Sequence, residues 1–303
     1  MNKSTTKIIY WVVAIVIAAV ISYWFFAPRF SGDVPINAVA LRVGTVGIHW
    51  YGLIIAVALL LGYELFIKKN IYKLGVSIDK FSTFLLLIVI TGIIGGRIGY
   101  IVQNFSYYIL HKSEMFAIWH GGMSIHGAII AGVLVSYFWA RYQKVNFLKL
   151  ADLLSPALVF GIAIGRLGNF FNQELIGTPA KVPWKMFVTA ANRPVEYIKT
   201  QYFHPVFLYE MILDFLILGI LLFVARKYHL KPGVVFFLFI GLYSIARFIV
   251  EFWRYNEIYY FWHLSLAQIV SIILIIISAA ALLFIQKPDL VSSLTNKDKT
   301  GTI

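Results

Sequence analysis

The sequence predicts an all-α fold, that of a polytopic helical membrane protein with about eight transmembrane helices. Of its 303 residues, 60% are hydrophobic and only 13% are charged, and the mean hydropathy is +0.82. Soluble domains carry roughly 25% charged residues. The apolar residues also stand in continuous runs, whereas the strands of a membrane-spanning barrel alternate apolar and polar residues. Together these observations exclude a soluble enzyme and a disordered chain.

Eight apolar runs approach the length of about 20 residues that a spanning helix needs. They cover residues 8–27, 51–67, 81–102, 124–140, 150–171, 205–225, 233–252 and 264–285. The first run resembles a signal peptide, but Trp24, Phe25 and Phe26 stand where a small-residue cleavage site would be. We therefore expect a retained N-terminal anchor over 1–33, a membrane core over 34–286 and a polar tail over 287–303.

The distribution of Lys and Arg orients these spans. With the N-terminus inside, the predicted inside segments hold 15 of these residues and the outside segments hold 8. Because cytoplasmic loops carry the excess of Lys and Arg, we expect both termini inside. The outside loop 172–204 contains three prolines and is long enough for a lid. The net charge of +13 then belongs to loops beside anionic lipid, and no basic groove motif indicates nucleic-acid binding.

Charged residues within spans are costly, so each is a candidate functional residue. The charged residues within these runs are Glu64, Arg97, Asp152, Arg166, Glu210, Asp214, Arg247 and Glu251. Glu64 and Asp152 lie near the predicted inside ends, where their side chains can reach the membrane interface. The others need a different explanation.

Most of the remaining polar residues fall at a similar depth although they come from distant spans. Those predicted in the outer half or at the outer edge are Arg97, His126, Arg166, Asn169, Asn172, Glu174, His204, Glu210, Glu251 and Arg254. Arg247 lies nearer the middle of its span. This arrangement predicts a polar site that opens toward the outer leaflet.

The segment from Arg247 to Arg254 indicates what such a site would bind. Arg247, Glu251 and Arg254 follow at i,i+4 and i,i+3 spacing and share one helix face. They could form a self-neutralising charge cluster inside the protein. Once Arg97 and Arg166 are added, however, we expect the arginines to outnumber the nearby carboxylates. A fixed anion is then expected, and in a membrane a lipid phosphate suits bidentate binding by guanidinium groups.

A histidine between glycines is the candidate for proton transfer. His126 lies in the segment Gly121-Gly-Met-Ser-Ile-His-Gly127, and histidine titrates closest to neutral pH. A purely structural histidine is the alternative. The chain has no cysteine, no G-x-S-x-G nucleophile motif, no H-E-x-x-H and no Asp-rich magnesium motif. We therefore expect no metal and no cofactor, which leaves positioning, electrostatics and a general base.

At these residues the sequence resembles the bacterial phosphatidylglycerol:prolipoprotein diacylglyceryl transferase family. Its most specific segment, similar to the family signature, is Gly165-Arg-Leu-Gly-Asn-Phe-Phe-Asn-Gln-Glu-Leu-Ile-Gly177. Further segments follow in the family's order, namely His49-Trp-Tyr-Gly52, Gly95-Gly-Arg-Ile-Gly-Tyr100, Gly121-Gly-Met-Ser-Ile-His-Gly127, His204-Pro-Val-Phe-Leu-Tyr-Glu210 and Tyr243-Ser-Ile-Ala-Arg-Phe-Ile-Val-Glu-Phe-Trp-Arg254. The family typically has seven spans, and the run 8–27 lies upstream of them.

The resemblance implies an enzyme of the bacterial cytoplasmic (inner) membrane with its active site toward the outer leaflet. It would move the diacylglyceryl group of phosphatidylglycerol to the cysteine thiol in the lipobox peptide of a prolipoprotein. The products would be a thioether-linked lipoprotein and glycerol phosphate. The nucleophile would be the substrate's cysteine, which fits a chain that has none.

The resemblance also suggests a role for each candidate residue. His126 would take the thiol proton, while Arg166 and Arg247 would hold the phosphate and stabilise the leaving oxygen. The substrate-binding set would comprise Tyr51, Arg97, Asn169, Asn172, Glu174, Tyr243, Glu251 and Arg254. His204 and Glu210 are equally well explained as structural residues.

Two other classes of protein remain open from the residues alone. Convergent arginines and a glycine-containing span also suit a transporter of lipids or small anions. A non-catalytic scaffold is the third possibility. Without the resemblance, a transferase and a transporter would be nearly equally favoured.

Overall fold

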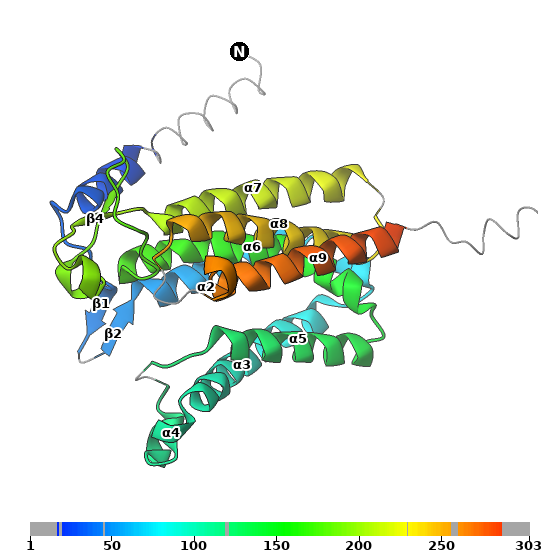
Figure 1. Cartoon of the computed structure of the whole chain (residues 1–303). Coiled ribbons are helices and arrows are strands. Elements are labelled where there is room, and N and C mark those ends of the chain that lie inside the picture. Colours follow the sequence, from blue (N-terminus) through cyan, green and yellow to red (C-terminus); the bar gives the residue numbers. More distant parts are fainter. Residues whose placement is uncertain are drawn as a thin grey trace, which may run out of the picture. The chain divides into compact units, whose positions relative to one another are not determined.

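The computed structural model is mostly helical over the part of the chain that it describes (Figure 1). That part comprises residues 17, 20–44, 46–118, 121–228, 230–255 and 260–286. The chain divides into two compact units, which are described separately below. Unit 1 consists of residues 1–59, 159–219 and 240–277, and unit 2 of residues 60–158, 220–239 and 278–303.

Within these described residues, six helices are long and apolar enough to cross a membrane, which confirms the prediction of a polytopic helical membrane protein (Figure 1). These spans are Trp50–Ile67, Ile78–Gln103, Phe147–Asn172, Val206–Lys227, Val234–Trp253 and Leu266–Ile285. The main helices are α2 Trp50–Gly62, α3 Ile78–Gln103, α4 Phe105–Tyr108, α5 Ile125–Tyr142, α6 Phe147–Asn172, α7 Val206–Lys227, α8 Val234–Val250 and α9 Leu266–Gln286.

Two predicted spans are not among these six. Helix α5 corresponds to the fourth predicted run, but its 18 residues include His126, Ser136 and Arg141, which lower its mean hydropathy. The first predicted run, 8–27, lies largely outside the described residues, and positions 20–31 are helical. The predicted tail, 287–303, lies outside them altogether. The count of eight spans therefore stays a prediction.

Two small sheets add to the all-α fold that the sequence predicted. Strands β1 Val39–Val43 and β2 Val46–His49 form an antiparallel hairpin immediately before α2. Strands β3 Met186–Phe187 and β4 Tyr202–Phe203 pair antiparallel within the predicted outside loop 172–204. In that loop the backbone leaves the helices, so short strand pairs satisfy some of its hydrogen-bonding groups.

In unit 1, an aromatic cluster holds the predicted outside loop against the end of α6. Phe170 and Phe203 are fully buried, and the Phe170 ring lies 5.2 Å from that of Phe207 on α7. The Trp50 ring stacks on Phe171 with 4.9 Å between centroids. These contacts fix the end of α6 relative to the first turns of α2 and α7.

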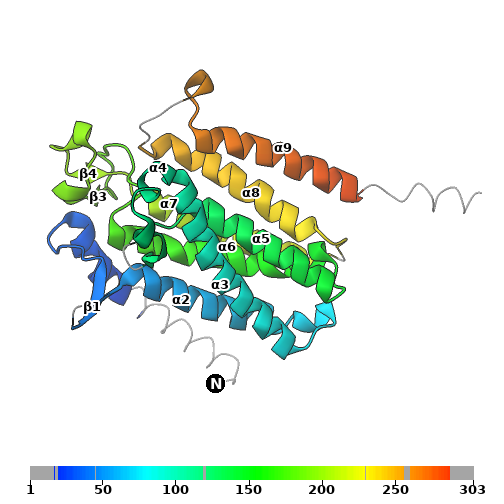
Figure 2. The ribbon, with the colours of Figure 1, turned by 90° about the horizontal axis from the view of Figure 1, so that it is seen from below.

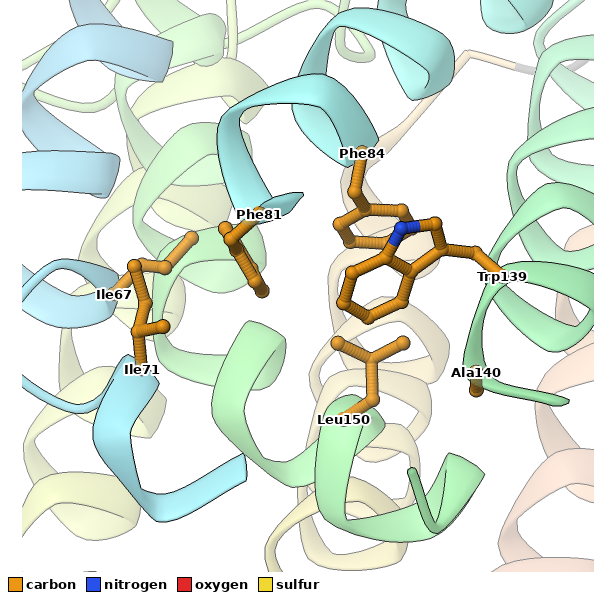
Figure 3. Close-up of a cluster of buried hydrophobic side chains, with 7 residues drawn as sticks. All are labelled: Ile67, Ile71, Phe81, Phe84, Trp139, Ala140 and Leu150. Carbon is orange, nitrogen blue, oxygen red and sulfur yellow. The ribbon is translucent and has the colours of Figure 1, made fainter. Parts of the chain in front are cut away.

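In unit 2, a second aromatic cluster ties α3 to α5. The Phe84 and Trp139 rings stack with 4.4 Å between their centroids, and Leu150 of α6 is buried in the same cluster (Figure 3). Asp152 of α6 accepts hydrogen bonds from the backbone N–H groups of Gly233 (2.7 Å) and Phe236 (2.8 Å). That carboxylate therefore caps the start of α8.

Glycines let α3 and α5 approach closely where they run side by side (Figure 2). A Cβ at Gly127 would overlap the carbonyl group of Gly95, and it would lie 3.0 Å from the Cα of Gly99. Such small-residue contacts are typical of helix pairs in membranes, where close backbone approach supplies the packing energy.

We expect Gly127→Ala to lower the unfolding temperature of the detergent-solubilised protein. Overpacking costs about 1–3 kcal/mol, which exceeds the gain of at most ~1 kcal/mol in helix propensity. Gly132→Ala on the same helix is the matched control, because a Cβ there meets nothing within 4 Å. Thermal unfolding curves compare the two variants. Equal melting temperatures would show that the Gly95–Gly127 contact does not limit the packing.

Candidate functional site

A buried ion network joins the parts of α6, α7 and α8 that belong to unit 1, where these helices run side by side (Figure 1). Its centre is Glu210 on α7, which is 5% exposed. One carboxylate oxygen lies 2.5 Å from Nη2 of Arg166 on α6, and the other lies 2.6 Å from Nη1 of Arg247 on α8. The two arginines that the sequence assigned to phosphate binding therefore point toward a common place.

Further groups surround this centre. Nη2 of Arg247 lies 2.6 Å from Oε2 of Glu251, and Ser265 donates a hydrogen bond of 2.8 Å to the other oxygen of that carboxylate. Arg166 donates to the hydroxyl oxygen of Tyr243 at 3.3 Å. On its other side, Nε of Arg166 lies 3.9 Å from Oδ2 of Asp214. Each guanidinium group is thus shared between two acidic side chains.

Arg254 belongs to the same electrostatic environment. Burial lowers its pKa first, and the positive charge of Arg247 lowers it further. Its backbone pairs with Gly177, so residues after α8 meet the loop after α6. Arg166, Arg247 and Arg254 are then matched in number by Glu210, Asp214 and Glu251. The expected surplus of arginines is not found in this network, because Asp214 adds a third carboxylate and Arg97 makes its hydrogen bonds within unit 2.

A second polar cluster lies where α6 ends. Asn169 donates a hydrogen bond of 2.7 Å to Glu174, and Asn172 donates to the same oxygen at 3.4 Å. Between them, Gln173 is 4% exposed and bonds in the loop to the carbonyl of Phe187 and to the backbone and hydroxyl of Thr189. These three predicted residues, Asn169, Asn172 and Glu174, therefore meet, and Gln173 anchors the loop beside them.

Tyr51 of α2 lies against the same part of α6. A Cβ at Gly168 would overlap its ring, so only glycine at that position allows this approach. This explains the second glycine of the Gly165-Arg-Leu-Gly-Asn169 segment. Tyr51 remains 37% exposed.

His204 takes part in a separate chain of hydrogen bonds. Its Nδ1 lies 3.0 Å from the hydroxyl of Tyr209, which also accepts a hydrogen bond of 2.8 Å from Trp184. Burial lowers the pKa of His204, so the neutral ring is favoured at neutral pH. These contacts connect the outside loop to the start of α7.

The remaining two predicted site residues, Arg97 and His126, belong to unit 2. Arg97 is 6% exposed and donates hydrogen bonds to four backbone carbonyl groups. His126 lies in the first turn of α5 and is exposed. Their convergence with the arginines of unit 1 stays a prediction.

The sequence named Asp214 as a charged residue within a span but gave it no role in the site, and it gave no sign of Ser265 or Gln173. Asp214 follows Glu210 at i,i+4 spacing, which places both on one face of α7, and that spacing was a usable signal. Ser265 and Gln173 gave no such signal, because each acts through a partner distant in sequence.

The fold and this network define a polytopic helical membrane protein with a buried arginine–carboxylate site. Residues 38–284 match the family described as prolipoprotein diacylglyceryl transferase. The chain belongs to that family, and the protein is therefore a membrane-spanning transferase.

Named relatives agree with this assignment. The phosphatidylglycerol–prolipoprotein diacylglyceryl transferase of Acaryochloris marina is 41% identical over 233 residues, covering 77% of this chain and 84% of the relative. The enzyme of the same name from Thermotoga maritima is 34% identical over 264 residues, covering 86% and 89%. That of Staphylococcus aureus is 35% identical over 251 residues, covering 82% and 89%.

We expect Glu210→Ala to destabilise the folded protein strongly. Removing one partner of a buried ion pair leaves uncompensated charge and costs about 3–5 kcal/mol. The matched control is Glu64→Ala, whose carboxylate pairs with Lys68 in the exposed turns that follow α2 and should matter little. Thermal unfolding in detergent measures both. A Glu210→Ala protein as stable as Glu64→Ala would contradict a structural role for the network.

Proposed function

We propose that this protein transfers the diacylglyceryl group of phosphatidylglycerol to the lipobox cysteine thiol of a prolipoprotein. The products are a thioether-linked lipoprotein and glycerol phosphate. The observation that carries the proposal is the single carboxylate held by both Arg166 and Arg247. A buried pair of guanidinium groups that grip one anion from two helices is suited to a lipid phosphate.

In this proposal the phosphate takes the place that Glu210 occupies in the structure. Each oxygen of Glu210 binds a different arginine, and a phosphodiester has two non-bridging oxygens that can do the same. Adding a phosphate to a network with three arginines and three carboxylates would leave excess negative charge in a buried place. Glu210 therefore turns away from the arginines when the lipid binds.

The chemical step is a substitution at the carbon of the diacylglyceryl group that carries the phosphate. His126 accepts the proton of the substrate thiol, because the thiolate is the nucleophile. The sulfur–carbon bond forms while the carbon–oxygen bond breaks, and the electron pair moves to the phosphate oxygen. Arg166 and Arg247 stabilise the charge that develops there. The proton held by His126 is then released to the leaving phosphate or to water.

The other predicted residues arrange the substrate. Asn169 and Tyr243 donate hydrogen bonds to the lipid head group, and Tyr51 lines the approach to it. Glu251 orients Arg247, which the 2.6 Å ion pair supports. Further proposed contacts come from Asn172, Glu174 and Arg254, while His204 positions the outside loop through Tyr209.

We expect Arg166→Ala and Arg247→Ala to lower the rate of transfer by about 100- to 1000-fold, the loss found when one donor to a developing oxyanion is removed. The measurement is mass analysis of a lipobox peptide incubated with purified protein and phosphatidylglycerol. A Cys→Ser peptide controls for the nucleophile, and Arg42→Ala, on an exposed strand, controls for charge. Normal transfer by Arg166→Ala would refute its assignment. A transporter would leave the lipid intact in every sample.

The pH dependence of the His126→Gln variant distinguishes a general base, which removes the thiol proton, from positive charges that only lower the pKa of the thiol. A free thiol has a pKa of about 8.5, so at pH 9 the substrate thiol is largely ionised without help. We expect the variant to be far slower than the unmodified enzyme at pH 7 and to recover much of the difference at pH 9. The same peptide assay measures both rates. A deficit that stays the same at pH 9 would remove the assignment of His126 as the base.

We also propose the membrane arrangement. Eight spans place both termini in the cytoplasm, with 34–286 as the transferase core and 1–33 as an extra anchor in the bacterial inner membrane. The active site faces the outer leaflet, where the proposed lipid and lipobox substrates meet it. The six apolar helices and the excess of Lys and Arg on the predicted inside support this arrangement.

Single cysteines test the orientation, because the chain has none of its own. Lys69→Cys follows α2 on the predicted inside, and Lys199→Cys lies in the predicted outside loop; both positions are exposed. A membrane-impermeant maleimide should label Lys199→Cys in intact spheroplasts and Lys69→Cys only after permeabilisation. The reverse pattern would invert the orientation.

A further inference from the structure

The buried charge of Arg97 on α3 is stabilised by backbone carbonyl groups and, within the part of the chain that the structure describes, not by a carboxylate. It is 6% exposed, and among the described residues no carboxylate lies within ion-pair distance of it. Four backbone carbonyl oxygens face the guanidinium group instead. Nε donates to Met115 at 2.9 Å, and Nη2 donates to Glu114 at 2.5 Å. Nη1 donates to Gly121 at 2.7 Å and to Gly122 at 3.0 Å.

These contacts use four of the five N–H groups of the arginine. A phosphate bound in bidentate fashion needs two of them, so it would have to displace at least one carbonyl from a buried place. The ring of Tyr108 lies 5.3 Å from the guanidinium carbon and covers it further. The hydrogen bonds of Arg97 are therefore better suited to holding the backbone in place than to binding a lipid phosphate.

The backbone that Arg97 holds leads directly into His126. Two residues after the clamped Gly122, the N–H of Ser124 donates to the carbonyl of Gly96 at 2.8 Å. Gln103 of α3 donates to the Ser124 hydroxyl at 2.9 Å, and Ser124 is 5% exposed at the N-cap position of α5. His126 is the second residue of that helix. Three residues of α3 thus fix the segment that precedes it.

We infer that Arg97 is a positioning residue for His126. By holding the segment 121–124, Arg97 sets the position of the His126 imidazole. This inference rests on the proposed function only in taking His126 as the proton acceptor. It gives Arg97 a role different from the lipid contact that its sequence position suggested. The two glycines contribute to this positioning, because both have positive φ, +83° at Gly121 and +78° at Gly122, a backbone conformation that glycine adopts without strain.

The two glycines supply a matched pair of variants. A Cβ at Gly122 would lie 2.5 Å from Cε1 of Tyr100 and 2.8 Å from Nη1 of Arg97, whereas a Cβ at Gly121 meets nothing within 4 Å. Both alanines carry the strain of a positive φ, but only Gly122→Ala presses on the arginine. We expect Gly122→Ala to lower kcat about 100-fold relative to Gly121→Ala, since a displacement of about 1 Å can cost that much.

Two further measurements distinguish positioning from lipid binding and from general destabilisation. Arg97→Lys, which cannot reach four carbonyls, should lower kcat and leave the KM for phosphatidylglycerol unchanged, whereas Arg166→Lys should raise that KM. In a His126→Gln background, Arg97→Lys should have little further effect on the rate per folded molecule, because contacts that act through one group are not additive. Loss of fold would instead lower the folded fraction in both backgrounds alike and leave the rate per folded molecule unchanged in both.

Hydrogen exchange at the Ser124 amide reports the clamp without any activity. It should be faster in Gly122→Ala than in Gly121→Ala. Equal exchange and equal kcat in the two glycine variants would overturn the inference, as would a raised KM in Arg97→Lys. If exchange differs but His126→Gln transfers normally, the proposed base fails while the clamp stands. If His126→Gln has no measurable turnover, the glycine pair and the KM values decide the question.

Discussion

A charged group inside an apolar protein needs an opposite charge or a full set of hydrogen-bond partners in contact with it. Glu210 supplies the opposite charge for Arg166 and Arg247 at once. Its two oxygens reach arginines on different helices at 2.5 and 2.6 Å, which ties α6, α7 and α8 together. Such a bridge is stabilising only while every partner is present, since an unpaired buried ion costs several kcal/mol.

The rest of unit 1 serves to keep this place in position. Glu251 and its hydrogen bond from Ser265 hold Arg247 from the far side, and Asp214 lies beside Arg166. Phe170 and Phe171 then pack the end of α6 into the aromatic cluster, so Arg166 is carried on a helix with a fixed end. In the proposed function, a rigid support of this kind lets binding energy go to the substrate rather than to ordering the side chains.

Arginine plays two different parts in this protein, and the partners distinguish them. Arg166 and Arg247 face carboxylates, which another anion can replace. Arg97 faces backbone carbonyls, whose partial charges belong to the fold and cannot leave. One residue type therefore makes both ion pairs with carboxylates and hydrogen bonds to backbone carbonyls within a single chain.

The sequence alone determined the class of protein, because apolar runs of spanning length and a low charge content leave few other folds. Motif spacing also placed Arg247 and Glu251 on one helix face, and their ion pair is present. Only the tertiary structure decided which groups pair across helices, such as Glu210 with both arginines and Arg97 with Gly121 and Gly122. Local sequence fixes periodicity, whereas contacts between distant segments depend on helix packing, and that packing exists only in the folded chain.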